Sequence, residues 1–205
     1  MLQLIKKDIA IHKFSWFIYI AMITIFIYAG NDIIFISALM SAIITMYAFY
    51  ADERANGHRL WNALPFSRSE IVGARYVSLI VNILICMLLV MIIELLTAGA
   101  LGGIFWREIL GSFVLVLISS AVFFPVFYLL SQRSAIFISL ILYILLVIGG
   151  AHFLYYLYLD LINTSVIPQT FSDVQFFGFG LFLSFSLYAL SCGVSVKIYK
   201  NKEII

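Results

Sequence analysis

The sequence predicts an all-α, polytopic membrane protein with six transmembrane helices, an amino-terminal interfacial helix and a short cytoplasmic helix between spans 2 and 3. Of its 205 residues, 64% are hydrophobic and only 11% are charged, and the mean hydropathy is +1.13. A soluble domain is about half apolar and a quarter charged, because its surface must stay wetted. The apolar residues also form stretches of membrane-spanning length, and the basic residues lie almost entirely on one side of them.

Six apolar stretches reach or approach the roughly 20 residues that a helix needs to cross the hydrocarbon core. They are 15–30, 33–50, 76–98, 109–130, 135–157 and 175–196. The first is short, and we expect it to borrow residues from the segment before it. Gly30, Asn31 and Asp32 form a turn signal, which predicts a tight hairpin between the first two spans. With no internal repeat or long linker, we interpret residues 1–205 as a single transmembrane domain.

The placement of lysine and arginine predicts the orientation, because cytoplasmic loops carry an excess of both. With the amino end inside, every Lys and Arg except Arg107 falls on the cytoplasmic side. We therefore expect both chain ends in the cytoplasm and 158–174 as an extracellular connection. Aromatic residues at the span ends fit the interfacial belts: Trp16, Tyr47, Tyr50 and Tyr76 inside, and Trp106, Tyr155 and Tyr158 outside.

Residues 1–14 are predicted to form an interfacial helix on the inner leaflet. Leu2, Ile5 and Ile9 share one helical face, while Lys6 and Lys13 lie on another. The alternative is a frayed, basic extension of the first span.

The cytoplasmic stretch 51–75 is the most informative loop. Leu60, Trp61 and Leu64 recur at helical spacing, and Pro65 ends that helix. One interpretation is an interfacial helix whose Trp61 rests on lipid headgroups. The other is a docking surface for a second protein, since Trp, Leu and Arg are typical anchors of interfaces.

A second helix begins directly after Pro65. Ser67 and Glu70 have the spacing of a capping box, and Phe66 and Ile71 that of a hydrophobic staple. We expect this helix to continue into the third span.

Several classes of function find no support in the sequence. None of the twelve glycines is followed by lysine, so there is no phosphate-binding loop of the Walker A kind. No Cys, His or carboxylate cluster has metal-ligand spacing, and no catalytic set is evident. The net charge of +2 is too small to indicate nucleic acid binding. Cys86 and Cys192 lie inside apolar runs and are interpreted as small core residues.

Two polar residues of the third span are candidates for a substrate path. A carboxylate in hydrocarbon is costly and usually faces protein or water, which makes Glu94 a candidate contact for a cationic or amphipathic substrate. The alternative is a glutamate close enough to the interface to stay hydrated. Asn82 lies further back on the same span and is either a second polar contact or an interhelical hydrogen-bonding residue. In the fourth span, Pro125 is expected to kink the helix.

The cytoplasmic loop also resembles a known family. The run Asp52-Glu53-Arg54, the run Leu64-Pro65-Phe66-Ser67-Arg68-Ser69-Glu70-Ile71-Val72 and Arg75-Tyr76 are similar to the loop of short ABC-2 type permeases. These are membrane subunits of bacterial ABC exporters, of about this length and span number. Pro125-Val126-Phe127-Tyr128 is a second similarity, although this chain has Ser131-Gln132 where the family often places a glycine.

The resemblance implies a coupling helix in this loop that docks on a separate ABC ATPase subunit. The residues it implicates are Arg54, His58, Arg59, Leu60, Trp61, Asn62, Leu64 and Pro65, with Leu60 and Trp61 as apolar anchors and Arg54, His58 and Arg59 at the rim. ATP and Mg²⁺ would be bound by the ATPase and no cofactor by this chain. A second permease copy, identical or related, would complete the assembly in a bacterial cytoplasmic membrane.

The leading hypothesis is therefore the permease subunit of an ABC-2 type exporter. The short chain is similar to permeases of phenol-soluble modulin and antimicrobial peptide exporters, which implies amphipathic peptide or lipid-like cargo. An alternative is a non-transport membrane anchor or regulatory subunit whose loop docks another protein. An ion-coupled secondary transporter is a third hypothesis, but it requires several buried charges near the midplane, and only Glu94 is available.

Overall fold

A computed structural model describes residues 2–54, 67–98, 105–129, 141–150, 152–153, 156 and 173–201. The labelled helices are α1 (Leu2–Ile11), α2 (Trp16–Tyr28), α3 (Ile33–Arg54), α5 (Arg68–Ala98), α6 (Phe105–Leu129) and α8 (Asp173–Asn201). A further helix covers Ile141–Gly150. The described part of the chain is all-helical and contains no strand, which confirms the predicted class.

Four of these helices are long and apolar enough to cross a membrane. The candidate spans are Ile33–Asp52, Arg68–Thr97, Glu108–Leu129 and Phe177–Asn201. The helices Trp16–Tyr28 and Ile141–Gly150 are shorter. At 1.5 Å per residue, the 13 residues of α2 cover about 20 Å, less than the roughly 30 Å of hydrocarbon. The structure thus supports a polytopic helical membrane protein with four full-length spans among the described residues, and the count of six stays a prediction.

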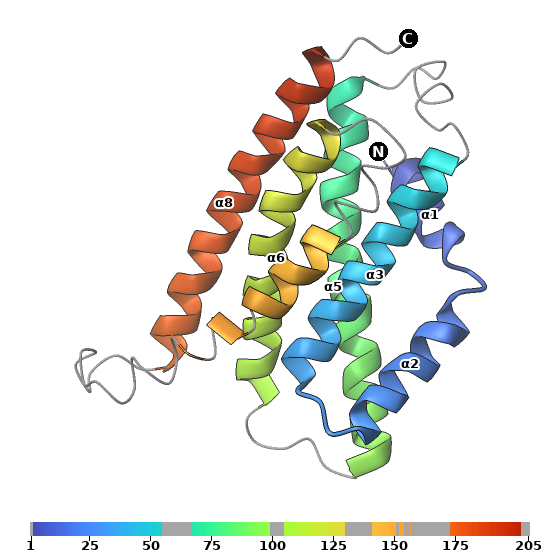
Figure 1. Cartoon of the computed structure of the whole chain (residues 1–205), viewed down its shortest axis with the longest axis vertical. Helices are drawn as coiled ribbons and strands as arrows, with labels where there is room; N and C mark the ends of the chain where they lie inside the picture. Colours follow the sequence, from blue (N-terminus) through green and yellow to red (C-terminus); the bar gives the residue numbers. More distant parts are fainter. Residues whose placement is uncertain are drawn as a thin grey trace.

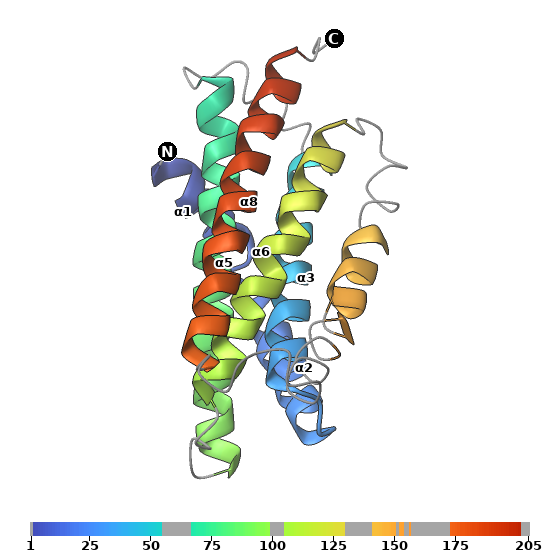
Figure 2. The same ribbon diagram turned by 90° about the vertical axis from the view of Figure 1, so that its left-hand side faces the viewer.

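The long helices form one bundle in which α6 is central. It packs along α8 on one side and α3 on the other, while α5 contacts α3 and α8 (Figure 1). Figure 2 shows the 141–150 helix beside α6. The two approach closely, because a Cβ added at Gly150 would lie 2.7 Å from Leu115 Cδ1. α2 packs against α3 and α5.

Two local predictions are confirmed in detail. The hairpin between α2 and α3 turns at Gly30, whose φ of 75° is the left-handed conformation that glycine adopts without strain. The Gly30 N–H donates to the Ile27 carbonyl and the Asn31 N–H to the Phe26 carbonyl, the pair of bonds that ends a helix in a Schellman motif. At the start of α5, the Ser67 N–H donates to Glu70 Oε2 at 2.9 Å, and the Glu70 N–H donates to Ser67 Oγ at 3.2 Å. Both bonds of the capping box are present.

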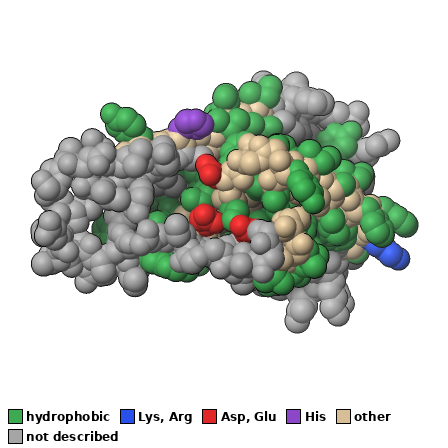
Figure 3. All heavy atoms as spheres, turned by 90° about the horizontal axis from the view of Figure 1, so that it is seen from below, with side chains coloured by type: hydrophobic (Ala, Val, Ile, Leu, Met, Phe, Trp, Pro, Cys, Tyr) green, Lys and Arg blue, Asp and Glu red, His purple; other side chains and the backbone are tan. Residues whose placement is uncertain are grey.

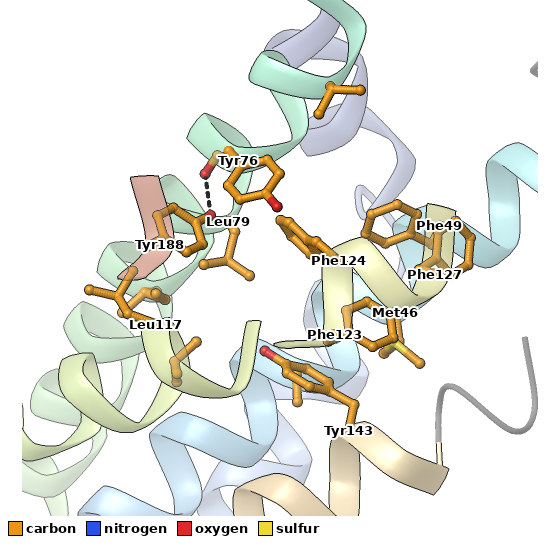
Figure 4. Close-up of a cluster of buried hydrophobic side chains, with 14 of the residues drawn as sticks. Met46, Phe49, Tyr76, Leu79, Leu117, Phe123, Phe124, Phe127, Tyr143 and Tyr188 are labelled. Atoms are coloured by element: carbon orange, nitrogen blue, oxygen red, sulfur yellow. Dashed lines mark hydrogen bonds between the residues drawn. The ribbon is translucent and has the colours of Figure 1, made fainter. Parts of the chain in front are cut away.

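The core is strongly aromatic. Phe49 of α3 lies among four rings of α6, and its centroid is 4.3 Å from that of Phe127 (Figure 4). The four α6 rings are Phe123, Phe124, Phe127 and Tyr128. Such tilted and edge-on pairs add to the burial of apolar area and fix the register of α3 against α6.

Tyr76 belongs to this core, and the prediction that it lies in the interfacial belt is wrong. Its side chain is only 4% exposed, its ring packs on Phe124, and Tyr188 O–H donates to its backbone carbonyl (Figure 4). Its hydroxyl lies 2.8 Å from both Ser191 Oγ and Ser195 Oγ of α8, so the polar end of the ring is satisfied inside the bundle.

α1 covers Leu2–Ile11, within the predicted segment 1–14, and its location on the inner leaflet stays a prediction. One of its faces packs on the bundle. Leu4 and Asp8, one turn apart, are both buried, and α1 contacts α5 and α3. Asp8 faces inward because Arg75 of α5 lies opposite it. The apolar pattern alone could not have identified this face, because one of its two buried residues, Asp8, is charged.

Candidate functional site

The loop expected to bind the ATPase is bounded by two helix ends that lie in the same part of the bundle. α3 ends at Arg54, and α5 begins at Arg68. Arg54 is thus the last residue of α3, but its side chain lies outside the described residues. The other predicted coupling residues also lie outside them: His58, Arg59, Leu60, Trp61, Asn62, Leu64 and Pro65. The structure does describe the end of α3, the start of α5 and the side chains that join these two helix ends to the rest of the bundle.

Four charged side chains join these helix ends to α1, and we call them the ion-pair network: Lys7, Asp8, Asp52 and Arg75. Lys7 Nζ lies 2.6 Å from Asp52 Oδ1 and 3.2 Å from Asp8 Oδ1. Arg75 Nη1 lies 2.9 Å from Asp8 Oδ1, and Arg75 Nη2 pairs with Asp52 Oδ2. Each carboxylate therefore meets both cations, and the network is neutral as a whole.

The ion-pair network is largely withdrawn from solvent. The side chains of Asp8, Arg75 and Asp52 are 4%, 10% and 17% exposed. Burial, and after it the nearby Arg75, lowers the pKa of Lys7 to about 8, while Asp8 acts in the opposite direction. A cavity of about 20 Å³ adjoins the network, lined by its four members and by Leu4, Ile71 and Ala74. This is room for about one water molecule, among several polar partners.

Arg75 also connects the network to the aromatic core. Its guanidinium carbon lies 5.0 Å from the centroid of the Phe49 ring, which is cation–π geometry. Phe49 in turn packs against Phe127 of α6. The start of α5 is thus joined to α1 and the end of α3 through charge, and to α6 through a ring of α3.

At the other end of the chain, α8 is attached to the start of α5. Arg68 Nη1 donates to the carbonyl of Lys200 at 2.8 Å and to that of Tyr199 at 3.4 Å. The last carbonyls of a helix have no partner within it and carry partial negative charge, so a guanidinium there is favourable. The residue that follows the N-cap of α5 therefore caps the carboxyl end of α8.

Pro125 lies inside α6, as predicted, and its effect reaches two other helices. A proline has no N–H, so the carbonyl of Ala121, four residues earlier, loses its helical partner. Ser191 Oγ of α8 donates to this carbonyl at 2.6 Å. The same Oγ lies 2.8 Å from the hydroxyl of Tyr76 on α5. One proline thereby organises a polar contact among three spans.

The two residues predicted for a substrate path lie apart. Asn82 is buried within α5, whereas Glu94 lies twelve residues further on, about 18 Å along the axis at 1.5 Å per residue. Glu94 Oε2 is buried without a hydrogen-bond partner among the described residues. Glu108 of α6 is close enough to interact electrostatically with Glu94 and Asp32, and acidic side chains gather at this end in Figure 3.

Sequence reasoning missed the ion-pair network as a unit. Asp52 and Arg75 stand in the runs that resemble the permease loop, and the position of Lys7 in the sequence indicates only the orientation of the chain. Asp8 carried one signal, an isolated acid in a basic amino-terminal segment. Its partner Arg75 is 67 residues away, so the pairing could not be read from spacing.

Comparison with known proteins supplies the family. A family model described as ABC-2 family transporter protein matches residues 3–200, nearly the whole chain. Neither the curated proteins nor the solved structures contain a match. The match agrees with the apolar helices and with the resemblance carried by the loop. The chain therefore belongs to the ABC-2 transporter family, as a multi-pass membrane protein that is the permease subunit of an ABC transporter.

Proposed function

We propose that this chain is the permease subunit of an ATP-driven ABC-2 type exporter, and that ATP and Mg²⁺ are bound and used by a separate ABC ATPase. The observation that carries the proposal is the pair of helix ends that bound residues 55–66. Asp52 of α3 and Arg75 of α5 are ion-paired to each other and to α1. A loop held this firmly at both ends can pass a displacement of its docked partner into two long helices.

The residues that contact the ATPase are proposed to lie within 54–65. Leu60, Trp61 and Leu64 act as apolar anchors, because a few buried aromatic and aliphatic side chains dominate most interfaces. Arg54, His58, Arg59 and Asn62 contribute polar contacts around them, and Pro65 ends the coupling helix before the capped start of α5.

The cargo is proposed to be an amphipathic peptide or another amphipathic, lipid-like molecule. Charged side chains are rare in the candidate spans, and Glu94 is the only one between Tyr76 and Ala98. Spans with few charges offer little to a strongly hydrophilic solute, whereas an amphipathic molecule can stay partly in lipid. Glu94 and Asn82 are proposed to make polar contacts with the cargo along its path through the permease.

The assembly is proposed to contain two permeases and two ATPases in a bacterial cytoplasmic membrane, with both ends of this chain in the cytoplasm. The almost one-sided distribution of lysine and arginine supports this orientation. The second candidate function, a membrane anchor that docks a different protein, makes the same use of the loop but predicts no transport.

Export is tested with inside-out membrane vesicles that contain this chain and an ABC ATPase encoded beside it. We expect ATP to drive uptake of a fluorescent amphipathic α-helical peptide into these vesicles. The matched control carries an ATPase whose Walker A lysine is replaced by alanine, and it should show no uptake. Absence of ATP-driven uptake above this control would contradict the exporter and favour the anchor.

A further inference from the structure

The ion-pair network brings together three segments that are distant in sequence. Lys7 and Asp8 come from α1, Asp52 from the last turn of α3 and Arg75 from the second turn of α5. The two segments that meet at Asp52 and Arg75 are the two ends of the proposed coupling loop.

The pairs form a closed ring. Asp8 contacts Lys7 and Arg75, and Asp52 contacts the same two cations. No helix can move away from the other two without separating at least two pairs at once. Charges withdrawn from water interact more strongly than exposed ones, and unpaired they are costly, so the ring resists partial opening.

Packing alone does not require this arrangement. Apolar residues of similar volume usually stabilise a buried position at least as well as an ion pair does. Leu4, Ile71 and Ala74 already supply apolar contact beside the network. The charges add a fixed relative position of the three helices, because each ion pair requires opposite charges and a defined hydrogen-bond direction.

We infer that Lys7, Asp8, Asp52 and Arg75 are positioning residues that make α1 and the two ends of the coupling loop move as one body when the ATPase acts. The inference rests on the proposed function and goes further, since it assigns the amino-terminal helix to the force-transmitting unit. The contact of Arg75 with Phe49 then passes the displacement to α6.

The first test measures the distance between α1 and α5 in each nucleotide state. Spin labels are placed at Ala10 and Val77, both exposed, in a Cys86→Ala, Cys192→Ala background, and the permease is reconstituted with its ATPase. We expect one distance, unchanged between the nucleotide-free and the ATP-trapped complex. In Asp8→Asn, which removes the ion pair between α1 and Arg75 of α5, the distance should broaden or shift between these states. A wild-type distance that changes with nucleotide would overturn the inference.

The second test separates binding from coupling. Lys7→Met should bind the ATPase as the wild type does but lose at least tenfold in peptide export per ATP hydrolysed. Lys7→Arg keeps the charge and should retain coupling. Lys13→Gln removes the same charge from an exposed position just after α1 and should behave as wild type. Wild-type export by Lys7→Met would refute the inferred role and leave the exporter intact, whereas failure of every form to bind the ATPase would refute the exporter and this role together.

Discussion

Ser191 of α8 donates its hydroxyl proton to the carbonyl of Ala121 on α6, across 2.6 Å. The carbonyl is available because Pro125 cannot supply the N–H that a helix would place there. In a lipid environment such a carbonyl has no water to bind, and another helix must satisfy it. The proline in α6 and the serine in α8 therefore form one structural feature.

Removing this serine should destabilise the fold. Ser191→Ala leaves the Ala121 carbonyl unpaired and removes a partner of Tyr76, so we expect the free energy of unfolding to fall by about 1–2 kcal/mol. Reversible unfolding in mixed detergent micelles measures the loss.

A double-mutant cycle tests the stated cause. Pro125→Ala restores the helical N–H, so Ser191→Ala should cost less in that background than in the wild type. The exposed Ser186 of the same helix is the control, and Ser186→Ala should change stability little. Equal costs of Ser191→Ala in both backgrounds would show that the proline is not the reason for the hydrogen bond.

Charge balance in the ion-pair network gives a second prediction. Asp8→Asn leaves Lys7 and Arg75 with one carboxylate between them, and the uncompensated buried charge should cost about 3 kcal/mol of unfolding free energy. Adding Lys7→Met restores neutrality while Arg75 and Asp52 stay paired, so the double variant should be more stable than Asp8→Asn alone. The unfolding free energies of the two variants, measured under the same detergent conditions, test this order of stability. A double variant less stable than the single one would contradict the balance argument.

His12 gives a prediction of pH dependence. It is fully buried between α1 and α2, its Nδ1 lies 3.1 Å from the Tyr19 hydroxyl, and its Nε2 has no partner among the described residues. Burial lowers the pKa of His12 to about 4, with smaller opposing contributions from Asp8, which raises it, and Arg75, which lowers it. Between the ordinary histidine pKa of 6.5 and this value, the unfolded chain binds more protons than the folded one. Stability should therefore fall as the pH drops through this window.

Comparing the wild type with His12→Phe at each pH isolates the contribution of His12 to stability. The melting temperature of the wild type minus that of His12→Phe should decrease steadily from pH 7 to pH 4.5, because carboxylates common to both proteins cancel. A difference that stays constant over this range would mean that His12 is not held neutral by its surroundings.

Local features of the fold could be predicted from the sequence because their causes are local. The turn at Gly30 and the capping box of Ser67 and Glu70 depend on residues within one helical turn of each other, and both are present. The lengths of α3, α5, α6 and α8 follow from runs of apolar residues. The expectation that the first span borrows residues from the segment before it is wrong, because a turn at 12–15 separates α1 from α2.

The framework of the site could not be predicted, because its partners are far apart in the chain. Arg75 and Asp8 are 67 residues apart, and Tyr76 and Ser191 are 115 apart. The residues near Arg75 in the sequence indicate only the orientation of the chain, and those near Tyr76 indicate an interfacial ring. Only the packing of α1 and α8 against α5 shows that both residues face inward.

Residues 54–65 are proposed to couple this permease to an ABC ATPase. The most direct test of this coupling is co-purification of the two subunits in nanodiscs, comparing wild type with a variant that combines Arg59→Ala, Trp61→Ala and Leu64→Ala. Arg133→Ala, in another predicted cytoplasmic loop, is the control. We expect wild type and Arg133→Ala to retain the ATPase and the triple variant, inserted in the membrane at the same level, to lose it. Retention of the ATPase by the triple variant, or binding by none of the three, would contradict this coupling.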